Sequence, residues 1–91
     1  MRVMYLILNL LYRNDAKSKV ISLTLKEIQA ALEAEGDKYN IRTVSYKIRE
    51  LKQDNYIKDG MKQKNANTYY ISAEGIEWLK QMEEEEGEIN E

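Results

Sequence analysis

The stretch Asn40-Ile41-Arg42-Thr43-Val44-Ser45-Tyr46-Lys47-Ile48-Arg49-Glu50-Leu51 carries the strongest pattern in this chain. Apolar residues recur in it at helical spacings of three and four, which predicts an amphipathic helix with a core face of Ile41, Val44, Ile48 and Leu51. The opposite side carries cations, hydroxyls and an amide: Arg42, Thr43, Tyr46, Arg49 and Gln53, with Ser45 at its edge. Side chains of these types contact base edges and phosphates in DNA. The pattern predicts a helix that packs on a core with one side and reads a nucleic acid with the other.

A second helix is predicted just before this one. Thr24-Leu25-Lys26-Glu27 has the spacing of a capping box, in which the Thr and Glu side chains each satisfy a free backbone N–H. The apolar face of this helix would consist of Leu25, Ile28, Ala31 and Leu32. Gly36 is a typical residue just past a helix end, and Asn40 can cap the next helix through its side-chain oxygen. Two helices joined by a short turn form a helix-turn-helix arrangement.

A hairpin with a polar, basic tip is predicted directly after this helix pair. Residues 56–63 have the composition of a strand, with a bend or bulge at Gly60, and residues 68–71 alternate as a second strand. Residues 64–67 between them form a turn, because Asn tolerates left-handed backbone conformations. Ser72 would cap a last helix that runs from Ala73 to about Glu83.

The N-terminal segment predicts a helix over about residues 2–12, followed by a short strand at residues 20–23. The polar face of this helix is only Arg2, Asn9 and Arg13, whereas a surface helix needs an apolar arc of about 100°. Two explanations remain open: a helix buried in the middle of the domain, or a helix whose second apolar side meets a partner chain. The segment lacks a small-residue cleavage site and the ~20 residues of a membrane span. We therefore expect a cytoplasmic protein with no membrane contact.

Composition narrows the classes of function. Ninety-one residues, 43% of them apolar, fit one small domain. The chain has no cysteine and no histidine, which removes thiolate metal ligands and the commonest general base. We expect no enzyme activity, no bound metal and no cofactor.

The charge is distributed unevenly along the chain. Residues 1–37 are neutral, residues 38–64 carry a net charge of +5, and residues 65–91 carry −7. The amphipathic segment of residues 40–51 therefore lies in the basic part of an acidic chain, as a nucleic-acid contact requires. Lys47, Lys52 and Lys58 in this part are expected to add to the local field or to pair with nearby acids.

These segments, in this order, resemble the winged-helix DNA-binding proteins of bacteria, archaea and their phages and plasmids. Residues 25–32 look like the support helix of that family, residues 43–51 like its recognition helix, and residues 68–75 like the second wing strand entering the last helix. Asn55 stands where the family usually has a Gly, which Asn can mimic in a left-handed conformation. The wing has no arginine, and the chain is acidic where many relatives are basic. The resemblance covers about residues 3–80.

The resemblance implies an α+β winged helix in the order helix-strand-helix-helix-strand-strand-helix, with a three-helix core, a two-stranded wing and a C-terminal helix. The domain would span residues 1–83, and residues 84–91 would form an acidic, disordered tail. The implied function is sequence-specific binding of double-stranded DNA as a dimeric transcriptional regulator, most simply a repressor. The recognition helix, about residues 40–53, would enter the major groove, and the wing, about residues 56–72, would contact the backbone. The candidate DNA contacts are Arg42, Thr43, Ser45, Tyr46, Arg49, Lys62, Lys64, Asn65 and Asn67.

A homodimer would present two recognition helices to a palindromic site about one helical turn apart. Trp78 and Met82 lie off the Ile76/Leu79 stripe on a helical wheel, so the expected dimer interface is Tyr5, Leu8, Tyr12, Trp78 and Met82. Two alternatives remain open. One is a protein-interaction winged helix within a larger assembly, which the acidic pI and the very apolar first helix favour. The other is a plasmid or phage replication or partition factor.

Overall fold

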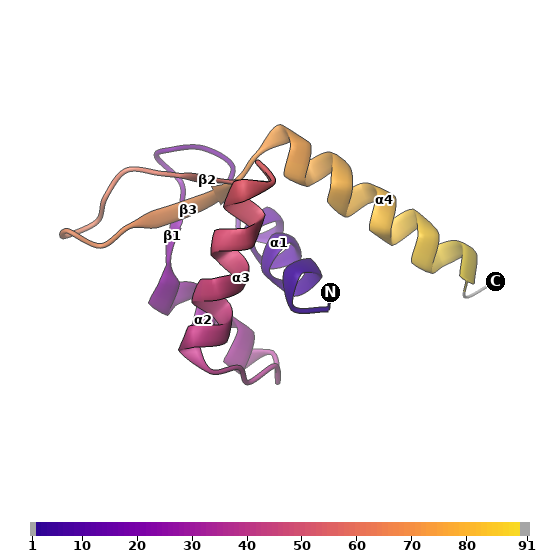
Figure 1. The fold of residues 1–91 in the computed structure, drawn as a ribbon, viewed down its shortest axis with the longest axis horizontal. Helices are drawn as coiled ribbons and strands as arrows, with labels where there is room; N and C mark the ends of the chain where they lie inside the picture. The colour runs from indigo at the N-terminus through magenta and orange to yellow at the C-terminus, as the bar shows by residue number, and fades with distance from the viewer. Residues whose placement is uncertain (1, 90–91) are drawn as a thin grey trace.

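The computed structural model describes residues 2–89, with side chains as far as Glu85, and within this range four helices pack with a three-stranded antiparallel sheet (Figure 1). The elements in chain order are α1 (Arg2–Arg13), β1 (Leu23–Thr24), α2 (Leu25–Ala34), α3 (Ile41–Gln53), β2 (Ile57–Asp59), β3 (Thr68–Ile71) and α4 (Ala73–Ile89). The chain is thus α+β, and the predicted order of helices and strands is confirmed.

Helix α1 lies in the middle of the fold, where it packs against α2, α3, α4 and β3. The side chains of Ile7, Leu8, Leu10 and Leu11 are at most 1% exposed. The breadth of the apolar surface on α1 is therefore explained mainly by neighbours within the chain. The prediction that Leu8 belongs to a dimer interface is wrong, because its side chain is completely buried in the core of one chain.

Helices α2 and α3 begin at the predicted caps. Thr24 Oγ1 accepts a hydrogen bond from Glu27 N at 3.1 Å, and Thr24 N donates to Glu27 Oε1 at 2.8 Å, which confirms the capping box. Gly36 follows α2 with a positive φ of 90°. Asn40 Oδ1 accepts from Arg42 N at 2.8 Å and so caps α3. The buried face of α3 consists of Val44, Ile48 and Leu51, each at most 2% exposed, as the apolar spacing predicted. Ile41, the fourth residue of the predicted core face, is only half-buried.

Strand β3 is the centre of the sheet and pairs with β1 on one side and β2 on the other. Leu23 lies opposite Tyr69, and Ile57 lies opposite Ile71. The strand predicted at residues 20–23 is wrong except for its last residue, because Val20 and Ile21 lie in an exposed loop. Only Leu23–Thr24 meets the edge of β3, and the position of that edge determines where β1 forms.

The β2–β3 hairpin is shorter than the sequence predicted. Strand β2 ends at Asp59, just before Gly60, where a bend was expected. A Cβ atom at Gly60 would lie 2.5 Å from Ser22 Oγ, so a glycine lets the loop between α1 and β1 approach closely. The predicted turn at residues 64–67 has its centre at Lys64 and Asn65, with φ values of 50° and 69°. Gln63 and Ala66 exchange two backbone hydrogen bonds of 2.9 Å around it, which makes a two-residue hairpin turn.

Helix α4 starts at the predicted cap but extends further than expected. Ser72 Oγ accepts from Gly75 N at 3.0 Å, and Leu79 is buried in the core. The helix continues to Ile89, so its predicted end at about Glu83 is wrong, and residues 84–89, expected in a disordered tail, are helical. The predicted tail also includes residues 90 and 91, which lie outside the described residues. Glutamate is a good helix former, which explains the continuation. The end of α4 projects beyond the rest of the fold (Figure 1).

Candidate nucleic-acid interface

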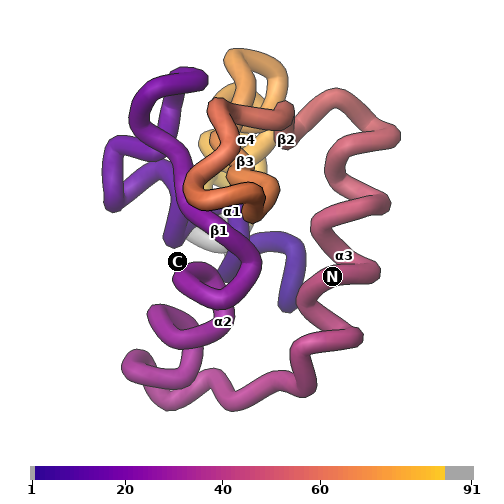
Figure 2. Tube along the Cα trace, turned by 90° about the vertical axis from the view of Figure 1, so that its left-hand side faces the viewer, coloured from indigo at the N-terminus to yellow at the C-terminus, as the bar shows by residue number. Residues whose placement is uncertain are grey.

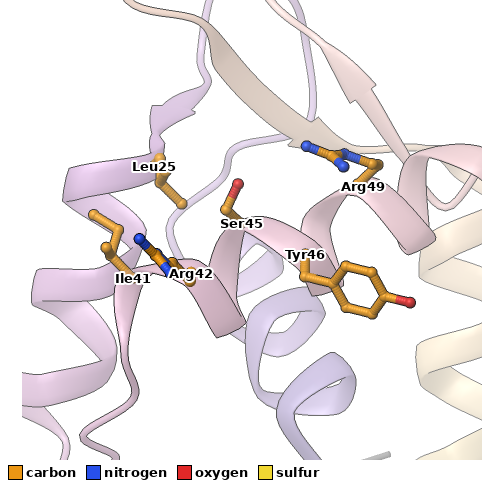
Figure 3. Close-up of a pocket in the computed structure, with 6 residues that line it drawn as sticks. All are labelled: Leu25, Ile41, Arg42, Ser45, Tyr46 and Arg49. Carbon is orange, nitrogen blue, oxygen red and sulfur yellow. The ribbon is translucent and has the colours of Figure 1, made fainter.

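The outward side of α3 forms one wall of a shallow groove of about 490 Å³. The burial of Val44, Ile48 and Leu51 turns the polar side of the helix outward. The groove is lined by Leu25, Ile41, Arg42, Ser45, Tyr46 and Arg49. Arg42 and Arg49 lie toward its two ends with Ser45 between them (Figure 3). Arg42 and Arg49 are seven positions apart on α3, which corresponds to about 10 Å along a helix axis.

A second groove of about 340 Å³ adjoins the first and reaches the hairpin. Its lining residues come from the start of α2, the start of α3 and the hairpin: Thr24, Leu25, Lys26, Ile41, Ala66, Asn67 and Tyr69. Leu25 and Ile41 line both grooves, so the two form a continuous concave surface. Figure 2, which looks onto the hairpin, shows α3 beside it and α2 below it. We call this surface, defined by the residues of the two grooves, the α3–hairpin surface.

The structure brings together five of the nine candidate DNA contacts. Arg42, Ser45, Tyr46 and Arg49 line the first groove, and Asn67 lines the second. Thr43 is exposed on α3 outside both grooves, and the remaining three candidates, Lys62, Lys64 and Asn65, are exposed in the hairpin loop outside both grooves.

Lys26 is a residue of this surface that the sequence did not single out. It stands inside the capping box at the start of α2, where its role looked purely local. In the structure it lines the groove that also holds Ala66 and Asn67 of the hairpin loop. Its position beside the hairpin depends on the pairing of β1 with β3, which puts the start of α2 next to residues more than 40 positions away.

Several cations of the α3–hairpin surface and the neighbouring hairpin loop form no ion pair within the described part of the chain, and neither does the exposed Lys58 of β2. Lys47 Nζ lies 3.1 Å from Glu50 Oε1, and Lys52 Nζ lies 3.0 Å from Asp59 Oδ1, as the prediction of pairing with nearby acids requires. Arg42 and Arg49 form no ion pair with any residue that the structure describes, and the same holds for Lys26, Lys62 and Lys64. Positive charge is therefore left uncompensated where the grooves lie.

The other four residues expected at a dimer interface are half-buried, and three of them have contacts within the chain. The Tyr5 hydroxyl donates to Glu83 Oε2 at 3.4 Å, and Lys17 Nζ lies 4.3 Å from the centre of the Tyr12 ring. Trp78 stacks on Tyr56, which explains its position off the Ile76/Leu79 stripe. Met82 is half-buried on α4.

Among the described residues, no three potential ligands of the types His, Cys, Asp and Glu cluster as a metal site would require, and no helix is long and apolar enough to cross a membrane. Comparisons of the chain with protein-family models, with curated proteins and with solved structures find no match. The α3–hairpin surface, with its concave shape and uncompensated positive charge, is the feature of the molecule that bears on function.

Proposed function

We propose that this protein is a winged-helix DNA-binding protein that recognises a specific double-stranded sequence and acts as a transcriptional regulator, most simply a repressor. One observation carries the proposal. The exposed side of a capped helix holds two arginines that form no ion pair with any described residue, and the groove that they line is continuous with one that reaches the β2–β3 hairpin. In this proposal α3 is the recognition helix and the hairpin is the wing.

The geometry supports insertion of α3 into the major groove, which admits an α-helix. Arg42 is in the first turn of α3, the part that enters most deeply in helix-turn-helix proteins, and its forked donors match guanine O6 and N7. Arg49, two turns further along α3, approaches the edge of the DNA major groove, where the phosphates lie. Thr43, Ser45 and Tyr46 supply hydroxyls for phosphates and apolar atoms for a thymine methyl group. Lys62, Lys64, Asn65 and Asn67 contact the backbone from the wing.

We also propose that the protein acts in the cytoplasm as a homodimer, which doubles the length of DNA that is read. The dimer would use α1 and α4, with Tyr5, Tyr12 and Met82, but without the buried Leu8 and without Trp78, whose off-stripe position is explained by its stacking on Tyr56. What supports this arrangement is the half-burial of these side chains on α1 and α4, two helices that pack against each other.

Selection of bound duplexes from a random pool, followed by a salt titration, tests the proposal. We expect enrichment of one sequence pattern, and a binding constant that falls linearly with salt on a logarithmic plot because bound phosphates release counterions. No enrichment, together with no detectable binding at low salt, would contradict DNA recognition. The genomic positions of the selected pattern then distinguish a regulator, with sites at promoters, from a replication or partition factor, with clustered repeats.

The wing lysines should act on affinity without changing sequence preference. Replacing Lys62 and Lys64 together by alanine removes two phosphate contacts, so we expect a salt slope lower by about 2 and similar weakening on all duplexes. Fluorescence anisotropy on a selected and a scrambled duplex measures both quantities. Lys80→Ala, an exposed cation on α4, is the matched control and should leave the slope unchanged. A changed base preference at an unchanged slope would contradict the wing assignment.

A specific observation favours protein interaction as a second candidate function. Three apolar side chains are prominently exposed on adjoining segments: Val20 by 79%, Ile21 by 53% and Met61 by 62%. The segments are joined by a hydrogen bond of 2.9 Å from Met61 N to Lys19 O, and Ser18 Oγ accepts from Ile21 N at 3.1 Å. The loop between α1 and β1 lies on the side of the hairpin away from α3 (Figure 2). Exposed apolar groups that gather in this way mark interaction sites in soluble proteins.

Val20→Asp combined with Met61→Asp tests this second function against the first. If a heteromeric complex is the protein's main role, the double variant should lose that complex in a quantitative pull-down, while Arg42→Ala with Arg49→Ala should keep it. Both variants should keep the wild-type circular dichroism spectrum, since all four side chains are exposed. If the variant with aspartate at Val20 and Met61 keeps the complex, the exposed apolar side chains of these two segments are not the site of protein interaction.

A further inference from the structure

A stacked aromatic pair lies outside the α3–hairpin surface. The rings of Tyr56 and Trp78 are parallel within 3°, with centroids 4.7 Å apart. Tyr56 comes from the segment between α3 and β2, and Trp78 comes from α4. Gly75 makes the approach possible, because a Cβ atom at this position would overlap the Tyr56 carbonyl oxygen. The Tyr56 carbonyl also accepts a hydrogen bond of 3.0 Å from Ser72 N, so the first turn of α4 is held directly on Tyr56.

The aromatic pair lines a shallow groove of about 390 Å³ along the first turns of α4. The other lining residues are Ala73, Glu74, Glu77 and Gln81. Both rings are only half-buried, so part of the aromatic surface faces the groove. Glu74 and Glu77 are exposed and stand three residues apart on the same side of the helix.

The negative charge of this groove is not compensated within the part of the chain that the structure describes. Neither Glu74 nor Glu77 forms an ion pair with a residue that the structure describes, and no lysine or arginine lines the groove. Elsewhere on the surface, carboxylates such as that of Glu35 have a cation close by, here Arg13 at 2.7 Å. A half-buried aromatic surface flanked by two unpaired carboxylates is complementary to a guanidinium group. That group is planar, stacks on aromatic faces and donates forked hydrogen bonds to carboxylates.

We propose that this groove, lined by Tyr56, Trp78, Glu74 and Glu77, docks an arginine side chain from a basic segment of a partner protein. The guanidinium stacks on the exposed part of the aromatic pair and donates hydrogen bonds to the glutamates. Lysine fits less well, because its ammonium is a compact, strongly hydrated charge that cannot stack. The groove shares no residue with the α3–hairpin surface, so an arginine-bearing partner and a DNA duplex can be held at the same time. The inference therefore does not depend on DNA binding.

Trp78 is the only tryptophan of the chain, so its fluorescence reports on this groove directly. The probes are three capped tetrapeptides, of arginine, of lysine and of citrulline, which has the shape of arginine without its charge. We expect a saturable change in emission with the arginine peptide, at least tenfold weaker binding of the lysine peptide, and no response to the citrulline peptide. An equal response to arginine and lysine, or no response to arginine, would overturn the proposal.

A pair of matched variants separates the groove from the general acidity of α4. Glu74→Gln with Glu77→Gln should weaken arginine-peptide binding at least tenfold. Glu84→Gln with Glu85→Gln removes the same charge from exposed positions further along the helix and should leave binding within twofold of wild type. If arginine-peptide binding weakens equally in the two variants, the peptide responds to the overall negative charge of α4, and the proposed site is wrong. The proposed site is also overturned if the molar mass of the protein rises with its concentration and the emission of Trp78 changes in the same way without peptide. A second copy of the chain then fills the groove. DNA binding measured on both variants should match wild type, which keeps this test distinct from that of the DNA proposal.

Discussion

Replacing Arg42 and Arg49 together by alanine is expected to lower the affinity for a selected duplex by about 100-fold or more. A forked arginine contact to guanine contributes about 1–3 kcal/mol of discrimination, and 1.4 kcal/mol corresponds to a factor of ten. Both guanidinium groups are exposed and lack an ion pair among the described residues, so neither is held by the fold when DNA is absent. The loss should therefore appear in binding and not in the free energy of unfolding.

The single variants should separate the two roles of these arginines. Arg42→Ala should relax the preference at one base position, whereas Arg49→Ala should weaken all duplexes alike and lower the salt slope by about 1. Arg42→Lys keeps the charge but loses the fork, so it should lose the base preference as Arg42→Ala does and leave the salt slope at its wild-type value. Electrophoretic mobility shifts on single-substitution duplexes measure the preference. Wild-type affinity of the double variant would remove α3 from the interface.

Leu8→Ala is expected to lower the free energy of unfolding by about 2–5 kcal/mol, the usual range for a large aliphatic side chain deleted from a core. Leu8 is completely buried on α1, the helix that contacts α2, α3 and α4. A small domain has a total stability of about 5–15 kcal/mol, so this single change removes a large fraction of it. Urea unfolding followed by circular dichroism measures the loss.

The same experiment decides between a core role and a dimer role for Leu8. Unfolding at two protein concentrations tenfold apart should show the same loss for Leu8→Ala, because a cavity inside one chain does not depend on association. Leu6→Ala, a half-buried leucine on the same helix, is the matched control and should cost clearly less. A loss that shrinks on dilution, as the energy of an interface does when the copies dissociate, would return Leu8 to an interface between copies.

The helix starts were predictable because each depends on residues close together in the chain. Thr24 and Glu27 satisfy each other's backbone groups across three residues, and Asn40 and Ser72 bond to amides two and three residues further on. Asn55 was expected to mimic a glycine, and its φ of 64° confirms this. Short-range hydrogen bonds of this kind leave a direct trace in the order of residue types.

The position of strand β1 and the role of Leu8 were mispredicted because they depend on distant partners. Val20 and Ile21 have the β-branched composition of a strand, but β1 forms only at Leu23–Thr24, where the edge of β3 is within reach. A helical wheel places Leu8 on an apolar side without telling whether α4 or another chain covers it. Periodicity reports that a side is buried and carries no information on what buries it.

Residue types and their helical spacing were sufficient to assign the outward chemistry of α3, with Arg42, Ser45, Tyr46 and Arg49 on one side. Tertiary packing alone brought Lys26 and Asn67 into one groove, and it stacked Trp78 on Tyr56 across 22 positions of the chain. The difference has a physical cause. The period of one helix sets which of its sides meets the core, whereas the composition of a groove depends on which distant segments pack side by side, and that is decided by the burial of the whole chain.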